Sequence, residues 1–392
     1  MLSFNSVDAF LKTHNPSLPV RCCRPFAVRR ATQWFQDHFP GELIYAVKAN
    51  CSNFVIEALI ENGVTHFDVA SVSEADQIAS LLPSARIMFM NPVKSMSAIK
   101  SAYFDYGVRT FALDHPGELA KILSATSNAD DLTLYVRLAC NDAGSLLPLG
   151  EKYGVGGNDA VQLLKDARRS AATLGVTFHV GSQALQAERF GEAIGVVSDH
   201  LKRAELKIDA LDIGGGFPVF YKAGDPSSLD HYMLSIKSAL CEVPMNEGGT
   251  FYAEPGRALV ADCESLLVQV DARRGADLFI NDGAYGMLYD AAHCDWSYPV
   301  RLVGHDKPSE TITSFRVWGP SCDAGDVLQW PFLLPNSVAE GDFIEIGLVG
   351  AYGIVMASGF NGFGRYEAIE VKDDCFGASF VQNLPAELRK IS

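Results

Sequence analysis

The sequence predicts an α/β protein in which a closed (β/α)8 barrel is followed by an all-β domain. From Leu43 onward, short apolar strands alternate with amphipathic helical stretches, which is the pattern of a parallel sheet. After Arg257 this alternation gives way to strand-like segments separated by turn signals such as Asp282-Gly283. We therefore expect an N-terminal lead-in over residues 1–40, a barrel over 41–258 and a β domain over 259–392.

Eight apolar segments qualify as barrel strands, and helical stretches separate them. They are Leu43–Lys48, His66–Ala70, Arg86–Met90, Val108–Leu113, Leu132–Ala139, Val176–Gly181, Ile208–Ile213 and Thr250–Glu254. In such a barrel the active site lies at the C-terminal ends of the strands. Polar residues stand at or just past those ends: Lys48, Asp68, Asn91, Asp114, Arg137, His179, Gly214–Gly216 and Glu254. An open doubly wound sheet, which would spread them along one edge, is the alternative architecture.

The flanking regions are interpreted from weaker patterns. Residues 1–40 are polar and irregular at first and then carry a helical pattern from Phe26 to Phe39, and part of this lead-in could pack on the β domain. In the β domain we expect strands at Ser265–Val270, Leu278–Asn281, Thr311–Trp318, Val327–Phe332 and Phe343–Ile346.

Composition excludes several classes of partner. The chain has 392 residues, is 48% hydrophobic and carries a net charge of -15. Neither nucleic acid nor an anionic membrane is therefore expected to bind, whereas the negative electrostatic potential of the chain suits a small cationic substrate. Nine cysteines without metal-ligand spacing are typical of reduced thiols, and no metal is expected. Neither an export signal nor an apolar run long enough to span a membrane is evident, so we expect a cytoplasmic protein.

Lys48 is the residue around which a site can be built. It ends an apolar strand just before Asn50-Cys51-Ser52-Asn53, where the backbone must turn. An isolated lysine there would ordinarily extend its amine to water. A desolvated lysine, in contrast, has a lowered pKa and supplies the neutral amine that an imine-forming residue requires. We therefore expect a Schiff-base lysine, and the rest of the chain should supply a cofactor site.

Three further motifs fit such a site, although each has a simpler explanation. Gly214-Gly215-Gly216 could cradle a phosphate with backbone N–H groups or could simply form a tight turn. Glu254 could face a cationic ring nitrogen while Arg257 binds a phosphate, or the two could pair with each other. His179 adds a flat imidazole that would more commonly be a core residue. Together with Lys48, these groups indicate pyridoxal 5'-phosphate.

At this point the sequence resembles the fold-type III pyridoxal-phosphate decarboxylases, which are alanine-racemase-like barrels with a β domain, and most closely the ornithine/lysine decarboxylase branch. Seven motifs match in order over nearly the whole chain. They are Tyr45–Asn50, Phe67–Ser71, His179–Ser182, Gly214–Pro218, Glu254–Arg257, Trp318–Asp323 and Phe360–Phe363.

The resemblance implies a role for each matched residue. Lys48, Glu254, His179 and Cys322 would be catalytic: Lys48 would hold the cofactor, Glu254 would pair with the ring nitrogen, His179 would stack on the ring, and Cys322 would return a proton to Cα. The cofactor site would also include Asp68, Arg137, Ser182, Gly215, Gly216, Gly256, Arg257 and Tyr352. The substrate would meet Tyr289, Asp290, Asp323 and Phe360. Cys322 and Asp323 would reach into a neighbouring subunit, which implies a homodimer with shared active sites.

The resemblance leaves the substrate open. Asp290 and Asp323 match carboxylates that grip the distal ammonium of a diamino acid, so L-ornithine is expected first, giving putrescine for polyamine biosynthesis, and L-lysine second, giving cadaverine. The segment between Gly286 and Leu288 is shorter than in animal ornithine enzymes, which keeps arginine or a carboxylated polyamine open, while diaminopimelate is disfavoured. A racemase is disfavoured because Glu254 replaces the cationic partner of the ring nitrogen. A non-catalytic protein resembling antizyme inhibitors is the remaining alternative.

Overall fold

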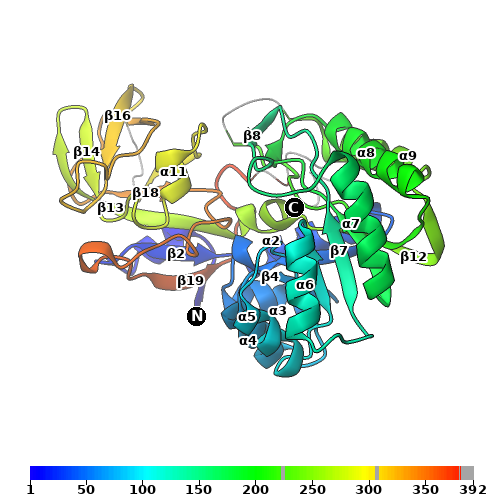
Figure 1. The fold of residues 1–392 in the computed structure, drawn as a ribbon. Coiled ribbons are helices and arrows are strands. Elements are labelled where there is room, and N and C mark those ends of the chain that lie inside the picture. The colour runs from blue at the N-terminus through cyan, green and yellow to red at the C-terminus, as the bar shows by residue number, and fades with distance from the viewer. Residues whose placement is uncertain (222–225, 305–308, 379, 381–392) are drawn as a thin grey trace.

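A closed barrel of eight parallel strands forms the larger part of the molecule, as the sequence predicts. The computed structural model describes residues 1–221, 226–304, 309–378 and 380. The barrel lies on the right in Figure 1, and pairing of its last strand with its first closes it. In chain order its strands are β3 (Glu42–Ala46), β4 (His66–Val69), β5 (Arg86–Phe89), β6 (Thr110–Leu113), β7 (Thr133–Arg137), β9 (Thr173–Thr177), β11 (Ile208–Asp212) and β12 (Met245–Ala253).

A helix follows each barrel strand. These helices are α3 (Asn53–Glu61), α4 (Val72–Leu81), α5 (Met96–Phe104), α6 (Pro116–Ala125), α7 (Gly157–Ser170), α8 (Glu188–Ala204), α9 (Leu229–Leu240) and α10 (Gly256–Val260), and α2 (Pro25–His38) precedes the barrel. Serine caps begin two of them: the Ser71 and Ser95 hydroxyls accept hydrogen bonds from the backbone N–H groups of Glu74 and Ala98.

Apolar side chains fill the barrel interior. Ile44, Met88, Ala112, Tyr135 and Ala210 form one buried cluster there. Gly175 leaves the space that the Tyr135 ring occupies, because a Cβ atom on Gly175 would lie 2.5 Å from that ring. The barrel is therefore a packed core and not a pore, and the site can form only at its open rim.

A nine-stranded sheet forms the second domain, on the left in Figure 1. It contains β13 (Glu264–Arg274), β14 (Asp277–Ile280), β15 (Val300–Val303), β16 (Ile312–Trp318), β17 (Phe332–Pro335), β18 (Phe343–Ile346) and β19 (Glu367–Val371). Two strands of the N-terminal segment, β1 (Leu2–Phe4) and β2 (Val20–Cys23), join it; β2 pairs with β13 and β19. The first residues of the chain thus form α1 (Val7–Leu11) and two strands, and the expectation of an irregular start was wrong.

Some expected element limits also need correction. Lys48 lies in the 3-10 turn η1 (Val47–Ala49), not in the strand. The sixth barrel strand ends at Thr177, since the apolar run beyond it turns into the site and continues to β10 (Ser182–Ala184), which pairs with β8 (Ser145–Leu147). The strand expected at Val327–Phe332 is β17 (Phe332–Pro335) instead, and the β domain also contains α11 (Tyr289–His293) and the 3-10 turns η2 (Ala261–Cys263) and η3 (Phe360–Gly362).

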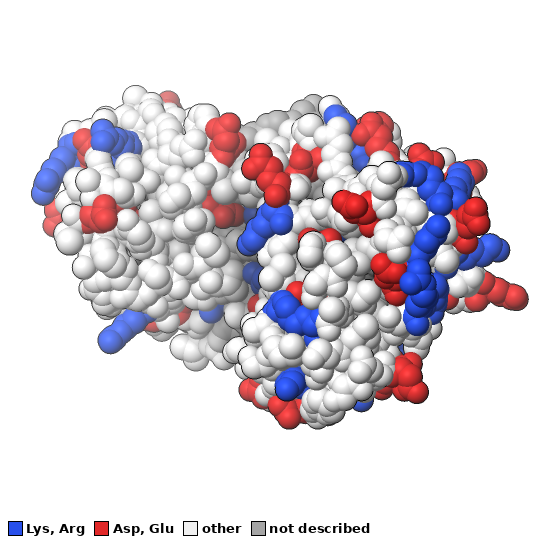
Figure 2. Space-filling model, in the orientation of Figure 1, with Lys and Arg blue, Asp and Glu red and all other residues white. Residues whose placement is uncertain are grey.

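Acidic and basic side chains are interspersed among uncharged ones on the barrel face shown in Figure 2. Among the described residues, no helix is both long enough and apolar enough to cross a membrane. The described part of the chain also holds no cluster of three or more potential metal ligands.

Candidate active site

Lys48 stands at the C-terminal rim of the barrel, directly after β3. Its Nζ atom lies 3.3 Å from Oδ2 of Asp68, which comes from the neighbouring strand β4. The Lys48 side chain is 51% exposed because it projects into an open cavity, whereas the Asp68 side chain is 4% exposed. The nearby carboxylate of Asp68 raises the pKa of Lys48 above its usual range. The expected lowering of this pKa was therefore wrong, because the attraction of Asp68 outweighs desolvation.

Two more carboxylates lie close to this pair. Glu254 follows β12, and its Oε1 atom is buried without a hydrogen-bond partner among the described residues. Burial raises the pKa of Glu254 well above its usual range, and the neighbouring carboxylates of Asp212 and Asp68 raise it further. Asp212, at the end of β11, accepts hydrogen bonds from the Thr177 hydroxyl at 2.6 Å and the Gly214 N–H at 2.9 Å. Three acidic side chains, Asp68, Asp212 and Glu254, thus lie close to Lys48.

His179 and Arg137 occupy another part of the rim. Nδ1 of His179 accepts a hydrogen bond from the Gly181 N–H at 3.0 Å. Burial lowers the pKa of His179 to about 3, and the cations Arg137 and Lys48 act in the same direction. The imidazole is therefore a neutral, flat ring at pH 7. Arg137, at the end of β7, lies with its guanidinium carbon 5.4 Å from the centre of the Tyr153 ring.

Glycines let the backbone approach the site closely. Gly214 and Gly216 have φ angles of 67° and 106°, which other residues rarely adopt. A Cβ atom on Gly216 would lie 2.4 Å from the Gly181 carbonyl oxygen. Gly256 begins α10, and Ser182 begins β10. Together these residues form a cradle of backbone N–H groups and one hydroxyl, which suits an anion such as phosphate.

Arg257 supplies the charge of this cradle. It is held in an aromatic cage, with its guanidinium carbon 4.6 Å from the Tyr352 ring centre and 5.1 Å from that of Trp296. One terminal nitrogen lies 3.0 Å from Oδ2 of Asp290. Its Nε atom is buried and has no partner among the described residues. Arg257 therefore pairs with Asp290, not with Glu254 as the simpler sequence interpretation suggested, and it keeps one N–H free for an anion.

These residues surround one cavity of about 710 Å³. Ten of the predicted residues line it: Lys48, Arg137, His179, Ser182, Gly215, Gly216, Glu254, Gly256, Arg257 and Tyr352. Sequence reasoning missed the rest of the wall, which consists of Ala46, Pro148, Leu149, Glu151, Lys152 and Tyr153. All but Ala46 lie between β7 and α7, in residues 138–156. A connection of that length is unusual between a strand and its helix and was the available signal.

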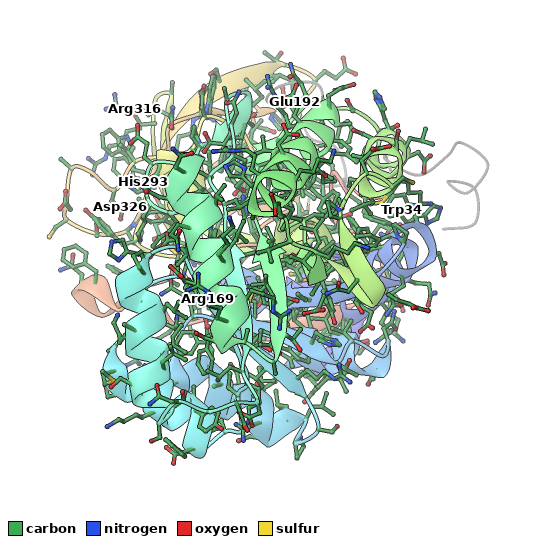
Figure 3. All side chains as sticks on the ribbon, turned by 45° about the vertical axis from the view of Figure 1, so that its right-hand side comes forward. Trp34, Arg169, Glu192, His293, Arg316 and Asp326 are labelled. Carbon is green, nitrogen blue, oxygen red and sulfur yellow. The ribbon has the colours of Figure 1, made fainter. Side chains whose placement is uncertain are left out.

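Six predicted residues do not line this cavity in the single chain: Asp68, Asp290, Cys322, Asp323, Tyr289 and Phe360. Cys322 and Phe360 are exposed, with Cys322 Sγ 3.6 Å from the Asn361 side-chain oxygen and the Phe360 ring 4.8 Å from that of Tyr285. The Cys322 loop is fixed by Asp326, labelled in Figure 3, whose carboxylate accepts hydrogen bonds from the N–H groups of Ser321 and Ala284. Asp290 is buried against Arg257.

The site has the polar groups that pyridoxal phosphate requires. The unpartnered Glu254 oxygen can accept a hydrogen bond from a protonated ring nitrogen, and a positive ring would favour the ionised form of Glu254. The free Arg257 N–H and the glycine cradle can receive the phosphate, while Lys48 offers an amine to the aldehyde. The residues present therefore fit this cofactor.

Comparison with family models identifies the family to which this chain belongs. Residues 26–261 match the model described as the pyridoxal binding domain of pyridoxal-dependent decarboxylases. The chain belongs to this family. The decarboxylase is accordingly a lyase that uses pyridoxal 5'-phosphate. Both the family resemblance and the closed barrel predicted from the sequence are thereby confirmed.

Individual relatives are similar to this chain over most of its length. The decarboxylase is 33% identical to a lysine/ornithine decarboxylase from Selenomonas ruminantium, covering 84% of each chain. It is 33% identical to the ornithine decarboxylase of Mus musculus, covering 82% of this chain and 73% of the relative. It is also 32% identical to antizyme inhibitor 2 of Xenopus laevis, covering 81% and 73%.

Solved structures give the same fold. An arginine decarboxylase from Paramecium bursaria Chlorella virus, solved with agmatine, matches with a TM-score of 0.83 and 26% identity over 93% of this chain and 99% of that one. A lysine/ornithine decarboxylase from Vibrio vulnificus, solved with cadaverine, matches with a TM-score of 0.81 and 26% identity over 94% and 100%. The names of these neighbours cover three basic amino acids.

Proposed function

We propose that the decarboxylase converts L-ornithine to putrescine and CO2, with L-lysine, giving cadaverine, as the alternative substrate. The observation that carries the proposal is the buried, unpartnered Glu254 oxygen facing a cavity that also holds Lys48. In the reaction the bond between Cα and the carboxylate carbon breaks, its electron pair stays on Cα, and Cα then gains a proton. When bound, pyridoxal phosphate supplies an aldehyde for the substrate amine and a ring that accepts those electrons.

Glu254 and His179 control the charge of the ring site. Glu254 would keep the proton on the ring nitrogen, because a buried carboxylate without another partner gains most from a cationic neighbour. His179 would stack against the ring as a neutral imidazole, since a second cation there would oppose the ring proton. Asp212 reinforces Glu254 by adding negative charge close to it.

Lys48 would supply the reacting amine, and Asp68 would accept the proton that this amine must lose. Lys48 must lose a proton before its amine can react, and the Asp68 carboxylate at 3.3 Å is placed to hold it. Ser182, Gly215, Gly216, Gly256, Arg257 and Tyr352 would bind the phosphate, and Arg137 would add positive charge near it. This fixes the reacting end of the cavity and leaves the wall around Glu151 for the substrate side chain.

The distal end of the substrate would be bound by carboxylates. A cationic side chain suits a chain with a net charge of -15, and Asp290, Asp323 and Glu151 are the candidate partners. Asp290 is already paired with Arg257, so Glu151, which lines the cavity and is exposed, joins the predicted set. Tyr289 and Phe360 would complete the substrate pocket.

The remaining parts of the proposal concern assembly. Cys322 and Asp323 lie outside the cavity of their own chain, which suits residues that serve a partner's site. We therefore propose a homodimer with two shared active sites, in which Cys322 returns the proton to Cα. Cys322 is exposed, as such a role requires. A cytoplasmic location and a place in polyamine biosynthesis belong to the same proposal.

The test is CO2 release by the cofactor-loaded protein from L-ornithine, L-lysine, L-arginine and meso-diaminopimelate, with Lys48→Ala as the control. Release from ornithine, absent in the control, supports the proposal, while faster release from lysine selects the alternative substrate. The similarity to antizyme inhibitor 2 raises a second candidate, a non-catalytic regulator. Cofactor binding without CO2 release from any of the four amino acids would favour it.

A further inference from the structure

A buried carboxylate outside the cavity joins the two segments that carry Lys48 and Tyr352. Glu264, the first residue of β13, is fully buried. Its Oε1 atom accepts a hydrogen bond from the Asn50 side-chain amide at 3.1 Å, and Asn50 is two residues beyond Lys48. The same amide donates to the Gly350 carbonyl oxygen at 2.7 Å, and Gly350 is two residues before Tyr352.

Backbone contacts reinforce this connection. The Tyr352 N–H donates to the Ala49 carbonyl oxygen at 2.8 Å, and the Val349 N–H donates to the Glu264 carbonyl oxygen at 3.1 Å. Tyr352 has a φ angle of 56°, which is uncommon for a residue other than glycine and persists only where neighbours hold it. The orientation of Tyr352 in the cavity therefore depends on contacts made outside the cavity.

The N-terminal segment completes the assembly. Arg21 of β2 binds the Glu264 carboxylate through two nitrogens, Nε at 3.1 Å and a terminal nitrogen at 2.6 Å. The latter nitrogen also donates to the Ser52 hydroxyl at 2.6 Å, and the Ser52 N–H donates to the Asn50 side-chain oxygen at 2.9 Å. Arg21 compensates the buried charge of Glu264 and fixes the geometry of its carboxylate.

We propose that Asn50 and Glu264, anchored by Arg21, are positioning residues that set the Lys48 amine and the Tyr352 side chain for cofactor binding. The inference rests on the proposed function because it concerns the reacting lysine. None of the three residues lines the cavity, so their effect must pass through the turn and loop that they hold. The N-terminal segment thereby acts on the active site as well as on the β sheet.

The experiment uses Asn50→Ala, Asn50→Asp, Glu264→Gln and the double variant Asn50→Asp/Glu264→Gln. The dissociation constant of pyridoxal phosphate and the visible absorption of the lysine-bound cofactor are measured first. The values of kcat and KM follow at saturating cofactor. We expect the single variants to weaken cofactor binding at least tenfold and to lower kcat, with the substrate KM changed less than threefold. Asn50→Asp should bind the cofactor most weakly, because two carboxylates then face each other, and the double variant should recover part of the loss by restoring a donor and an acceptor.

Glu345→Gln is the matched control. Glu345 is an equally buried carboxylate of the same sheet, and it binds Arg24, Ser265 and Arg301 instead of the Lys48 turn or the Tyr352 loop. Glu345→Gln should lower thermal stability without changing the cofactor dissociation constant. Equal weakening by Glu345→Gln, or unchanged binding in Asn50→Ala, would overturn the inference while leaving the proposed function intact. If Asn50→Ala fails to fold, Arg21→Lys replaces it in the same measurements, and unchanged cofactor binding in Arg21→Lys would overturn the inference. A wild-type protein that binds no pyridoxal phosphate would overturn both this inference and the proposed function.

Discussion

Arg257 and Asp290 form a buried ion pair at 3.0 Å, with side chains 6% and 11% exposed, at the edge of the proposed phosphate site. Removing one partner of such a pair leaves an uncompensated charge, so Asp290→Asn should lower the free energy of unfolding of the cofactor-free protein by about 3 kcal/mol. A bound phosphate supplies the missing anion, so saturating pyridoxal phosphate should raise the Tm of the variant more than that of the wild type. Pyridoxal without phosphate is the control, and an equal rise in both proteins would contradict the proposed phosphate site.

Glu254 should show opposite effects on stability and activity. In the cofactor-free protein its raised pKa means that ionisation of Glu254 opposes folding. Glu254 therefore destabilises the folded state at neutral pH, and this destabilisation disappears as the pH falls. Glu254→Gln should therefore unfold at a higher temperature than the wild type at pH 7.5, yet lose about 100- to 1000-fold in kcat because the ring proton is no longer held. Differential scanning calorimetry and CO2 release measure the two effects. A variant that is less stable and retains activity would refute the role assigned to Glu254.

Much of the fold and part of the site could be predicted from the sequence. Alternating apolar and amphipathic segments identified the barrel, and Lys48 and Glu254 could be placed at its rim because strand ends converge there. The pairing of β2 with β13 and β19 escaped prediction, since a four-residue strand carries little periodic signal and its partners are more than 200 residues away. Sequence proximity also suggested Glu254 as the partner of Arg257, whereas folding brings Asp290 to it from α11.

The cavity wall shows a second limit of sequence reasoning. Pro148, Leu149 and Glu151 have neither a helical nor a strand period, and they reach the cavity because β8 pairs with β10. The Asp142 carboxylate further fixes this loop by accepting hydrogen bonds from the Leu149 and Gly150 N–H groups. Contacts of this kind depend on the folded loop and leave no local pattern in the sequence.

Asp282 should make folding stability depend on pH. It is buried, accepts hydrogen bonds from the Tyr366 hydroxyl at 3.1 Å and the Met287 N–H at 3.0 Å, and burial raises its pKa to about 7. In the unfolded chain the Asp282 carboxyl loses its proton at about pH 4. Between about pH 4 and 7 the folded chain therefore binds more protons than the unfolded chain, and the contribution of Asp282 to stability falls as the pH rises. Asp282→Asn should flatten the pH dependence of Tm over this range, whereas the exposed Asp130→Asn should not. Parallel curves for wild type and Asp282→Asn would contradict this assignment.

Glu151 should contribute to the choice of a cationic substrate. It is exposed, so an ion pair with the distal ammonium of the substrate is worth less than about 1 kcal/mol, and Glu151→Gln should raise the KM for L-ornithine by about two- to fivefold with kcat nearly unchanged. L-Norleucine, which lacks the distal ammonium, is the matched control, and any weak turnover of it should have the same KM in both proteins. Increasing ionic strength should reduce the difference between wild type and variant for ornithine, because salt screens exposed charges. An unchanged KM for ornithine, or an equal rise for norleucine, would assign the distal ammonium to Asp290 and Asp323 alone.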